Sequence, residues 1–257
     1  MNFTAAGLSD VGLQREHNED SYCILSEHRL FVVADGMGGH RAGDVASHMA
    51  TTEMTAFFDA TSVDGEGVDW PSEENSRLTP EQSRLVSSVK LANQRIFQAS
   101  VGNRSVQGMG TTVVGALYAR EDGKIHIAHV GDSRAYRVRA GDITQVTRDH
   151  SLLNDYLLVM PNLTDAQRER LPSNVITRAL GMQDSVAVDL HFEDVEPGDV
   201  YVLCSDGLNG MVSDHRILDI VHGAGADVET TAKALVAQAN ENGGEDNTTV
   251  VVVRITE

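Results

Sequence analysis

The sequence contains few of the features that identify secreted and membrane proteins. It has two cysteines, Cys23 and Cys204, and each lies inside an apolar run that reads as a strand. Isolated thiols of this kind predict free, buried cysteines in a reducing compartment rather than a disulfide framework. The longest apolar runs, such as TVVGALYA, are far below the ~20 residues that a membrane helix needs. The first residues, MNFTAAGLSDVG, lack the basic start and apolar core of a signal peptide, so we expect a cytoplasmic protein.

Basic residues are also scarce. The 257 residues include 20 Lys and Arg against 38 Asp and Glu, which gives a formal charge of −18 at pH 7. A nucleic-acid surface needs a basic stripe, and an anionic membrane attracts basic segments, so neither partner is expected. Hydrophobic residues make up 41% and charged residues 23%, as in ordinary globular proteins. Part of the excess acid is therefore expected to bind cations.

Several motifs of nucleotide-binding proteins, hydrolases and metalloproteins are absent. The glycine-rich stretch GMGGHRAG lacks the Gly-Lys-Ser/Thr ending of a Walker loop, and it does not match GxGxxG. No Gly-x-Ser-x-Gly elbow, EF-hand spacing or Cys/His set with zinc spacing occurs. None of these site classes is indicated.

The apolar patterns predict blocks of strands separated by pairs of helices. Strand patterns occupy 3–8, 21–25, 29–34, 111–119, 124–131, 134–146, 186–192, 200–204 and 248–255, and helical patterns occupy 42–60, 85–99, 213–222 and 227–242. The second helix is preceded by Thr79-Pro80-Glu81-Gln82, which fits a capping box. Residues 61–78 read as an exposed acidic loop, and the valines at 250–253 suggest a strand that is covered on both faces. This segregation predicts an α+β fold.

One hairpin brings two carboxylates together. If the turn between 21–25 and 29–34 is centred between Glu27 and His28, Asp20 lies directly opposite Asp35, with Cβ atoms ~5 Å apart. Like charges at ~4 Å repel by about 4 kcal/mol at an effective dielectric of 20. Something must offset that repulsion.

Three further aspartates follow or precede strands in a similar way. Asp206 follows the strand pattern in VYVLCSDG, and Asp246 precedes the last strand. Both are expected to lie at the same sheet edge as Asp35. A hairpin turn at Asp122-Gly123 would place Asp132 beside Val113, next to the GTT of 110–112. Taken singly, each aspartate is explained by the common occurrence of Asp in turns. A cluster of oxygen ligands without a nearby lysine, however, favours Mg²⁺ or Mn²⁺.

The order of the motifs resembles that of a known family. REHNEDSY, VADGMGGHRAG, GTT, VGDSRAY, TRDHS, VITRALG, CSDGL and EDNTTVVVV occur in the sequence of the metal-dependent, type 2C serine/threonine protein phosphatases, in their compact bacterial form. The resemblance runs from about residue 7 to residue 255. It implies a four-layer α/β/β/α sandwich of two antiparallel sheets flanked by antiparallel helix pairs. It also implies one domain over 1–257, with a flap subdomain at about 149–172.

The resemblance further implies a binuclear Mn²⁺ or Mg²⁺ centre with a third, weaker metal. By this resemblance, Asp35 would bridge the two metals. The Gly36 carbonyl and Asp20 would bind one of them, and Asp206 and Asp246 would bind the other. Asp132 would bind the third metal, and Glu19 would lie beside the ligands. Arg15, which alone would read as a solvated charge, matches the phosphate-binding arginine, whose guanidinium fits phosphate oxygens. Met37 stands where animal members have a histidine, which leaves His40 as a general acid or as a structural residue.

The implied reaction is hydrolysis of phosphoserine and phosphothreonine in proteins, by direct attack of a water shared by the metals. A serine/threonine kinase and its substrates are the expected partners, and a monomer is expected. A non-catalytic binding relative and a small-molecule phosphoesterase are the alternatives. His150 is expected to be structural. The apolar part of the flap, 157–160, is expected to pack on the sandwich, with contact to substrate proteins as the alternative.

Overall fold

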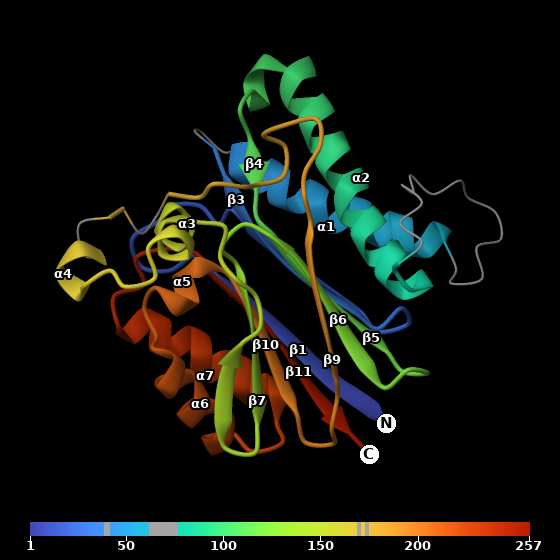
Figure 1. Cartoon of the computed structure of the whole chain (residues 1–257), viewed down its shortest axis with the longest axis vertical. Coiled ribbons are helices and arrows are strands. Elements are labelled where there is room, and N and C mark those ends of the chain that lie inside the picture. The colour runs from blue at the N-terminus through green and yellow to red at the C-terminus, as the bar shows by residue number, and fades with distance from the viewer. Residues whose placement is uncertain (39–41, 62–76, 169–170, 173–174) are drawn as a thin grey trace.

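Two antiparallel β-sheets stack face to face, and each carries a pair of helices on its outer side (Figure 1). The computed structural model describes residues 1–38, 42–61, 77–168, 171–172 and 175–257. The α+β, four-layer α/β/β/α sandwich predicted from the sequence is confirmed. Most of the acidic loop expected at 61–78 lies outside the described residues.

The first sheet carries the two C-terminal helices. Its strands, in order across the sheet, are β1 (Asn2–Asp10), β11 (Thr248–Thr256), β10 (Val200–Cys204), β7 (Arg134–Arg139) and β8 (Asp142–Gln145), and its helices are α6 (Asp214–Gly223) and α7 (Val228–Glu241). In β11, Val250 and Val252 pack toward the helices, whereas Val251 and Val253 pack toward the other sheet. Because successive side chains of a strand point to opposite faces, the valine run is buried on both sides, as predicted.

The second sheet carries the two N-terminal helices. Its strands are β2 (Asp20–Leu25), β3 (Leu30–Met37), β5 (Val113–Ala119), β6 (Lys124–Val130) and β9 (Asp189–Asp194), with the short β4 (Gly110–Thr111) paired to β3, and its helices are α1 (Ala42–Ala60) and α2 (Pro80–Gly102). The start of α2 is the predicted capping box. The Gln82 N–H donates to Thr79 Oγ1, and the Thr79 N–H donates to Gln82 Oε1.

A buried apolar layer joins the two sheets. Phe31 and Val33 of β3 belong to the same cluster as Leu203 of β10 and Val251 of β11. Each of these side chains is fully buried. The layer therefore fixes the ends of β3 and β10, which come from different sheets, relative to one another.

The remaining helices are short. They are the 3₁₀ turn η1 (Arg104–Val106), α3 (Leu152–Val159), α4 (Asp165–Arg168) and α5 (Asp206–Asn209). Within the described part of the chain, no helix combines the length and apolar character needed to span a membrane.

The register of β5 and β6 differs from the sequence prediction. Val113 pairs with Val130, and Ala119 pairs with Lys124, so the turn spans four residues and is not centred on Asp122-Gly123. The prediction that Asp132 lies beside Val113 is therefore wrong. Asp132 instead lies where the chain crosses from β6 in one sheet to β7 in the other. A turn of unknown length leaves the register undetermined, which is why the sequence misplaced this residue.

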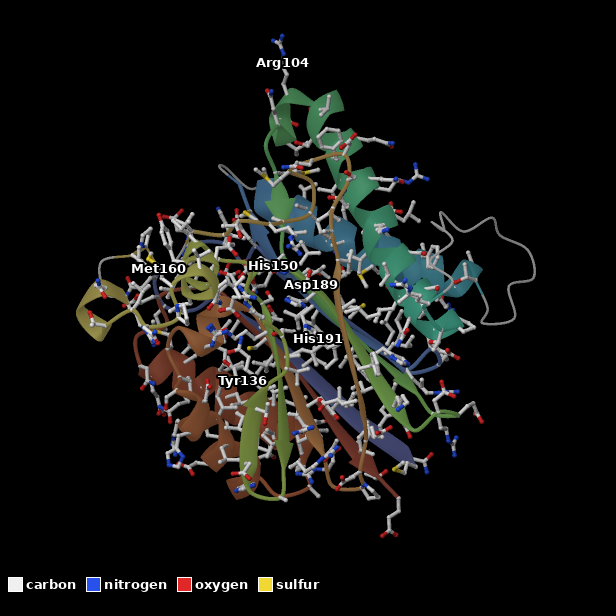
Figure 2. The ribbon with its side chains drawn as sticks, viewed as in Figure 1. Arg104, Tyr136, His150, Met160, Asp189 and His191 are labelled. Carbon is white, nitrogen blue, oxygen red and sulfur yellow. The ribbon has the colours of Figure 1, made fainter. Side chains whose placement is uncertain are left out.

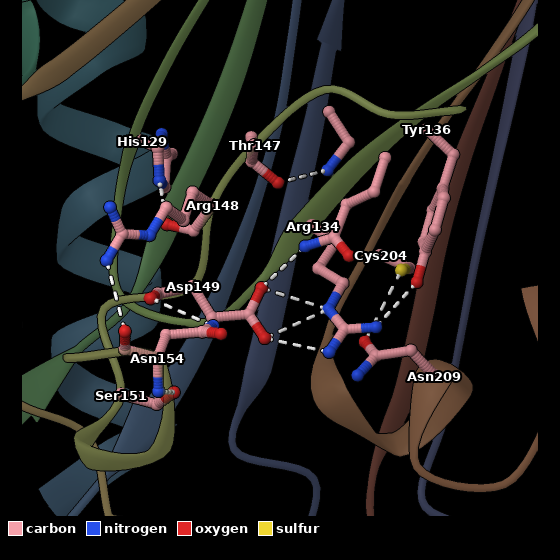
Figure 3. Close-up of polar contacts among 12 residues, drawn as sticks. His129, Arg134, Tyr136, Thr147, Arg148, Asp149, Ser151, Asn154, Cys204 and Asn209 are labelled. Atoms are coloured by element: carbon pink, nitrogen blue, oxygen red, sulfur yellow. Dashed lines mark hydrogen bonds and ion pairs between the residues drawn. The ribbon is translucent and has the colours of Figure 1, made fainter. Parts of the chain in front are cut away.

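The start of the predicted flap (residues 149–172), here called the flap root, is tied to both sheets by polar contacts (Figure 3). Arg134 of β7 forms an ion pair with Asp149, with Nη2 and Oδ2 2.7 Å apart. His129 of β6 donates from Nε2 to the Arg148 carbonyl at 2.8 Å, and Asn154 donates from Nδ2 to the Asp149 carbonyl at 3.2 Å. These contacts fix the start of α3 relative to the β6–β7 crossover.

The apolar end of α3 does not pack on the sandwich. Leu158, Val159 and Met160 are exposed by 63%, 82% and 46%. Figure 1 shows α3 and α4, in yellow, at the left of the view and outside both helix pairs. The expectation that residues 157–160 pack on the sandwich is therefore wrong for Leu158, Val159 and Met160, whereas Leu157 is half-buried.

Candidate active site

Two aspartates face each other across the β2–β3 hairpin. Asp20 pairs with Asp35 in the antiparallel register, as the sequence predicted. Burial, followed by repulsion from Asp20 and Asp206, raises the pKa of Asp35 well above its ordinary value. Burial likewise raises the pKa of Asp20 to about 7, although Ser205 Oγ donates to its Oδ2 at 2.7 Å. Both shifts arise mainly because burial disfavours the charged form of a carboxyl group, and the neighbouring acids add to the effect.

The backbone around Asp35 is held by the threonines of the GTT motif. The Thr112 N–H and the Thr111 hydroxyl both donate to the Asp35 carbonyl at 2.8 Å. Asp35 donates its own N–H to Thr112 Oγ1 at 3.2 Å. These bonds fix the end of β3 and so determine where the Asp35 carboxylate lies.

Position 36 requires glycine because other backbone segments pack closely against it. A Cβ at this position would lie 2.1 Å from the Gly43 carbonyl oxygen and 2.5 Å from the Glu19 carbonyl oxygen. Both approaches are far shorter than real Cβ contacts, so only glycine fits. The start of α1 and the strand end of β3 are thereby brought into direct backbone contact.

The first sheet supplies the other two aspartates. Asp206 begins α5 directly after β10, and Asp246 lies just before β11, which pairs with β10. Burial and then repulsion from Asp246 raise the pKa of Asp206, while a side-chain hydrogen bond with Asp35 lowers it. A Cβ on Gly207 would lie 2.1 Å from the Asn247 carbonyl oxygen, so this close approach also needs glycine.

Asn247 connects the N-terminal loop to this edge. Its Nδ2 donates to the carbonyls of Val11 and His17, both at 2.9 Å, and its Oδ1 accepts from the Glu19 N–H at 2.8 Å. Its side chain is almost fully buried. The loop that it holds includes Arg15, whose Nη2 lies 2.6 Å from Asp246 Oδ2.

A cavity of about 760 Å³ opens between these elements. Its described lining residues are Arg15, Glu16, His17, Glu19, Asp35, Gly36, Met37, Gly38, Ile176, Asp206, Asp246 and Asn247. The predicted meeting of Asp35, Asp206 and Asp246 is therefore confirmed. Asp20 does not line the cavity but lies behind Asp35, whereas Glu19 faces it. Burial and the Asp44 carboxylate raise the pKa of Glu19.

Asp132 lies on the neighbouring side of the same edge. It lines a second cavity of about 460 Å³, which shares Arg15, Asp206 and Asp246 with the first. Burial, followed by repulsion from Asp206, raises its pKa to about 7. His150 holds the turn before Asp132. Its ring Nδ1 accepts a hydrogen bond from the Gly131 backbone N–H at 3.0 Å, and its backbone N–H donates to the Gly131 carbonyl at 2.9 Å.

The acids of this edge suit a hard divalent cation. The Oδ1 atoms of Asp20 and Asp132 are buried and have no hydrogen-bond partner among the described residues. Carboxylate oxygens without nitrogen or sulfur donors match Mg²⁺ or Mn²⁺ rather than Zn²⁺. A divalent cation would satisfy these oxygens and offset the repulsion that raises their pKa values.

A second group of potential ligands lies beside the flap root, where Figure 2 labels His150, Asp189 and His191. His129, His150 and Asp189 each offer one potential ligand atom, and these three atoms lie within 4.8 Å of one another. The rings of His129 and His150 are stacked, however, with 10° between their planes, so their in-plane lone pairs do not converge. The Arg178 guanidinium already lies 2.6 Å from Asp189 Oδ1. This cluster is therefore read as structural.

Two supporting residues were not assigned from the sequence: Thr112 and Asn247. They lie within the GTT and EDNTTVVVV motifs, but hydrogen-bonding side chains near turns are too common to identify by residue type. His17, which lines the cavity, was missed for the same reason. His40, for which the roles of general acid and of structural residue were both left open, lies outside the described residues.

Asp35→Asn is expected to stabilise the metal-free protein. Because burial raises the pKa of Asp20 and Asp132 to about 7 and that of Asp35 above its ordinary value, the metal-free fold retains protons that the unfolded chain has released. Its stability should therefore fall as pH rises from about 4 to about 7. At pH 8 with chelator, the neutral amide should raise the free energy of unfolding by about 1–3 kcal/mol, measured by urea denaturation, with little difference at pH 4.

The matched control is Asp142→Asn, since Asp142 is exposed at the start of β8. It should leave stability unchanged at both pH values. An Asp35→Asn protein that is less stable than the wild type at pH 8 would contradict the repulsion argument.

Comparison with known proteins places this site in a family. A family model described as Protein phosphatase 2C matches residues 14–243. The protein phosphatase PhpP of Streptococcus pneumoniae is 36% identical over 256 residues, which cover 97% of this chain and 96% of the relative. The crystal structure of the serine/threonine phosphatase PstP/Ppp of Mycobacterium tuberculosis matches with a TM-score of 0.84 and 33% identity, over 100% of both chains.

A further crystal structure bears on the metal. The catalytic domain of the serine/threonine protein phosphatase PstP, in complex with two manganese ions, matches with a TM-score of 0.82 and 33% identity, over 99% of both chains. The match to the family model, the identity to relatives over nearly the whole chain and the shared fold agree with the acid-lined edge described above. The chain belongs to the protein phosphatase 2C family.

Proposed function

We propose that this protein is a metal-dependent serine/threonine phosphoprotein phosphatase. The observation that carries the proposal is the meeting of Asp35, Asp206 and Asp246 in one cavity that also contains the Arg15 guanidinium. Among the described lining residues there is no serine, threonine or cysteine, so no hydroxyl or thiol nucleophile faces the substrate there. Water is therefore the proposed nucleophile, and no phosphorylated side chain is needed.

The proposed cofactors are two Mn²⁺ or Mg²⁺ ions, with a third bound more weakly. Asp35 would lie between the two, with the Gly36 carbonyl and Asp20 on one side and the first-sheet acids Asp206 and Asp246 on the other. Asp132 would hold the third, and Glu19 would act beside the ligands from the cavity side. When bound, such ions lower the pKa of water and draw charge from phosphoryl oxygens.

Arg15 is proposed to bind the substrate phosphate. Its contact with Asp246 orients the guanidinium toward the cavity, and Asn247 holds the loop that carries it. A guanidinium has five N–H donors, so one contact with a carboxylate leaves others for phosphate oxygens. The side chain is 55% exposed, which leaves it accessible to a protein substrate.

The proposed substrates are proteins that carry phosphoserine or phosphothreonine, made by a serine/threonine kinase that this enzyme opposes. We further propose a cytoplasmic protein, since Cys23 and Cys204 are free thiols. A monomer is proposed because the acids proposed to bind the metals form a complete set within this chain and need no residue from a second copy. A dimer in sedimentation experiments would contradict the proposal that the protein is a monomer.

A non-catalytic binding role is less well supported. A chain that had lost activity would be expected to lose metal-binding acids, and here the full set of aspartates is present. A small-molecule phosphoesterase would share the metal chemistry and differ only in its substrate. Phosphate release from a phosphothreonine peptide separates these possibilities, because neither a non-catalytic relative nor a small-molecule phosphoesterase would release it.

The central test is phosphate release from a phosphothreonine peptide. With Mn²⁺ the wild type should release phosphate, and with chelator it should not. Asp35→Asn should lower kcat/KM by about 100-fold or more, because it removes one charge from the position between the metals. Metal-independent release, or full activity in the variant, would contradict the proposal.

Two further variants separate the roles in this assay. Asp142→Asn should behave as the wild type. Arg15→Ala should lower kcat/KM while the protein keeps its stabilisation by Mn²⁺ in thermal unfolding, since the arginine is proposed to bind phosphate rather than metal. Loss of Mn²⁺ stabilisation in Arg15→Ala would instead indicate that the arginine supports the metal site.

We also propose that residues 149–172 form a flap on a single phosphatase domain and contact protein substrates. The support is the exposed apolar end of α3 next to a root that is fixed beside Asp132. Replacing Leu158, Val159 and Met160 by serine should lower kcat/KM on a phosphoprotein about fivefold and leave p-nitrophenyl phosphate turnover unchanged. Val101→Ser, an exposed apolar change at the end of α2, is the control. Equal turnover of the phosphoprotein would dismiss the substrate role.

A further inference from the structure

A second hollow adjoins the active-site cavity. It has a volume of about 410 Å³ and lies between the end of β3 and the segment 176–187. Met37 and Ile176 line both spaces, so the two meet at these side chains. The VITRALG motif and the residues after it form most of the wall of this hollow. These residues have no role in the proposed reaction.

The chemistry of this hollow contrasts with that of the active site. Five carboxylates are among the described residues that line the active-site cavity, whereas none of the described residues that line the hollow is acidic. Its apolar members are Met37, Ile176, Ala179, Met182, Val186 and Ala187. The one cation among its described lining residues, Arg178, is paired with Asp189. The hollow therefore favours an uncharged, apolar occupant.

The far wall is held rigidly to the strand that positions Asp35. Leu180 exchanges two backbone hydrogen bonds with Thr111, at 2.8 and 3.1 Å. Asn93 of α2 accepts from the Gly181 N–H at 2.9 Å and donates to the Gln183 carbonyl at 3.1 Å. The distance between the hollow and the active site is thus set by the fold rather than by a free loop.

Met182 forms the outer side of the hollow and is available to a ligand. Its side chain is 55% exposed, although it is large and apolar. It lies over Gly110, where a Cβ would be 3.2 Å from its Sδ, and Gly110 pairs with Met37 in the sheet. Two methionines therefore flank the hollow, and their flexible, polarizable side chains adapt to apolar groups of different shape.

We infer that this hollow binds an apolar side chain of the substrate polypeptide, one or two residues from the phosphorylated residue. The inference rests on the proposed phosphatase function and names a substrate preference for the same site. A chain spans ~3.3–3.6 Å per residue, so a phosphoresidue in the active-site cavity brings its near neighbours to Met37 and Ile176. An acidic neighbour would gain no free cationic partner among the described lining residues, since Arg178 is already paired with Asp189.

The test compares matched phosphothreonine peptides with Mn²⁺. Leucine is placed in turn at each of the two positions before and after phosphothreonine, in a peptide that otherwise has serine there. At one position, leucine should raise kcat/KM at least about tenfold over serine or aspartate, the effect expected for burial of one apolar side chain. Met182→Glu should remove this advantage and leave kcat/KM for the serine peptide and for p-nitrophenyl phosphate within twofold of the wild type.

Val101→Glu is the matched control, because it places the same charge at an exposed apolar position that lines neither space. It should keep the leucine preference. The inference is overturned if leucine gives no advantage at any of the four positions, or if Met182→Glu leaves the advantage intact. Either result with normal p-nitrophenyl phosphate turnover contradicts the inference alone, whereas a wild type that releases phosphate from no substrate contradicts the proposed function.

Discussion

Repulsion among buried carboxylates is the constraint on which this structure depends. Asp20 and Asp35 face each other across a hairpin, and Asp206 adds a third acid from the other sheet. Burial first and their mutual repulsion second raise the pKa values of these acids, and the Arg15 guanidinium beside Asp246 only partly offsets this for Asp206. The metal-free protein is therefore held in a strained electrostatic state, and a divalent cation is the chemical group that relieves it.

Rigid backbone contacts keep the acids together despite this cost. The apolar layer between the sheets fixes the strand ends, and Gly36 and Gly207 let backbone segments approach more closely than any side chain would permit. Asn247 and Thr112 then hold the loop and the strand that carry the ligands. The site is thus preorganised by packing and hydrogen bonds, which is the arrangement that metal and phosphate binding require.

The groups proposed for the chemistry and those proposed for substrate contact lie in different parts of the structure. The acid-lined cavity contains the proposed reacting groups, whereas the hollow beside Met182 and the exposed end of α3 are apolar and carry no catalytic side chain. The flap root is fixed to the same crossover as Asp132, while its apolar end is left uncovered. Substitutions in these outer regions can therefore change which proteins are bound without changing the metal site.

The sequence by itself determined the fold class, most helix and strand positions, the Asp20–Asp35 register and the identity of the acids. These features depend on local periodicity, capping and turn chemistry, which act over a few residues. The tertiary structure alone decided the β5–β6 register, the position of Asp132 at a crossover between sheets and the exposure of residues 158–160. It also decided the contacts of Asn247 and the hollow at Met182. These depend on turn length and on packing between distant segments, and no local pattern encodes them.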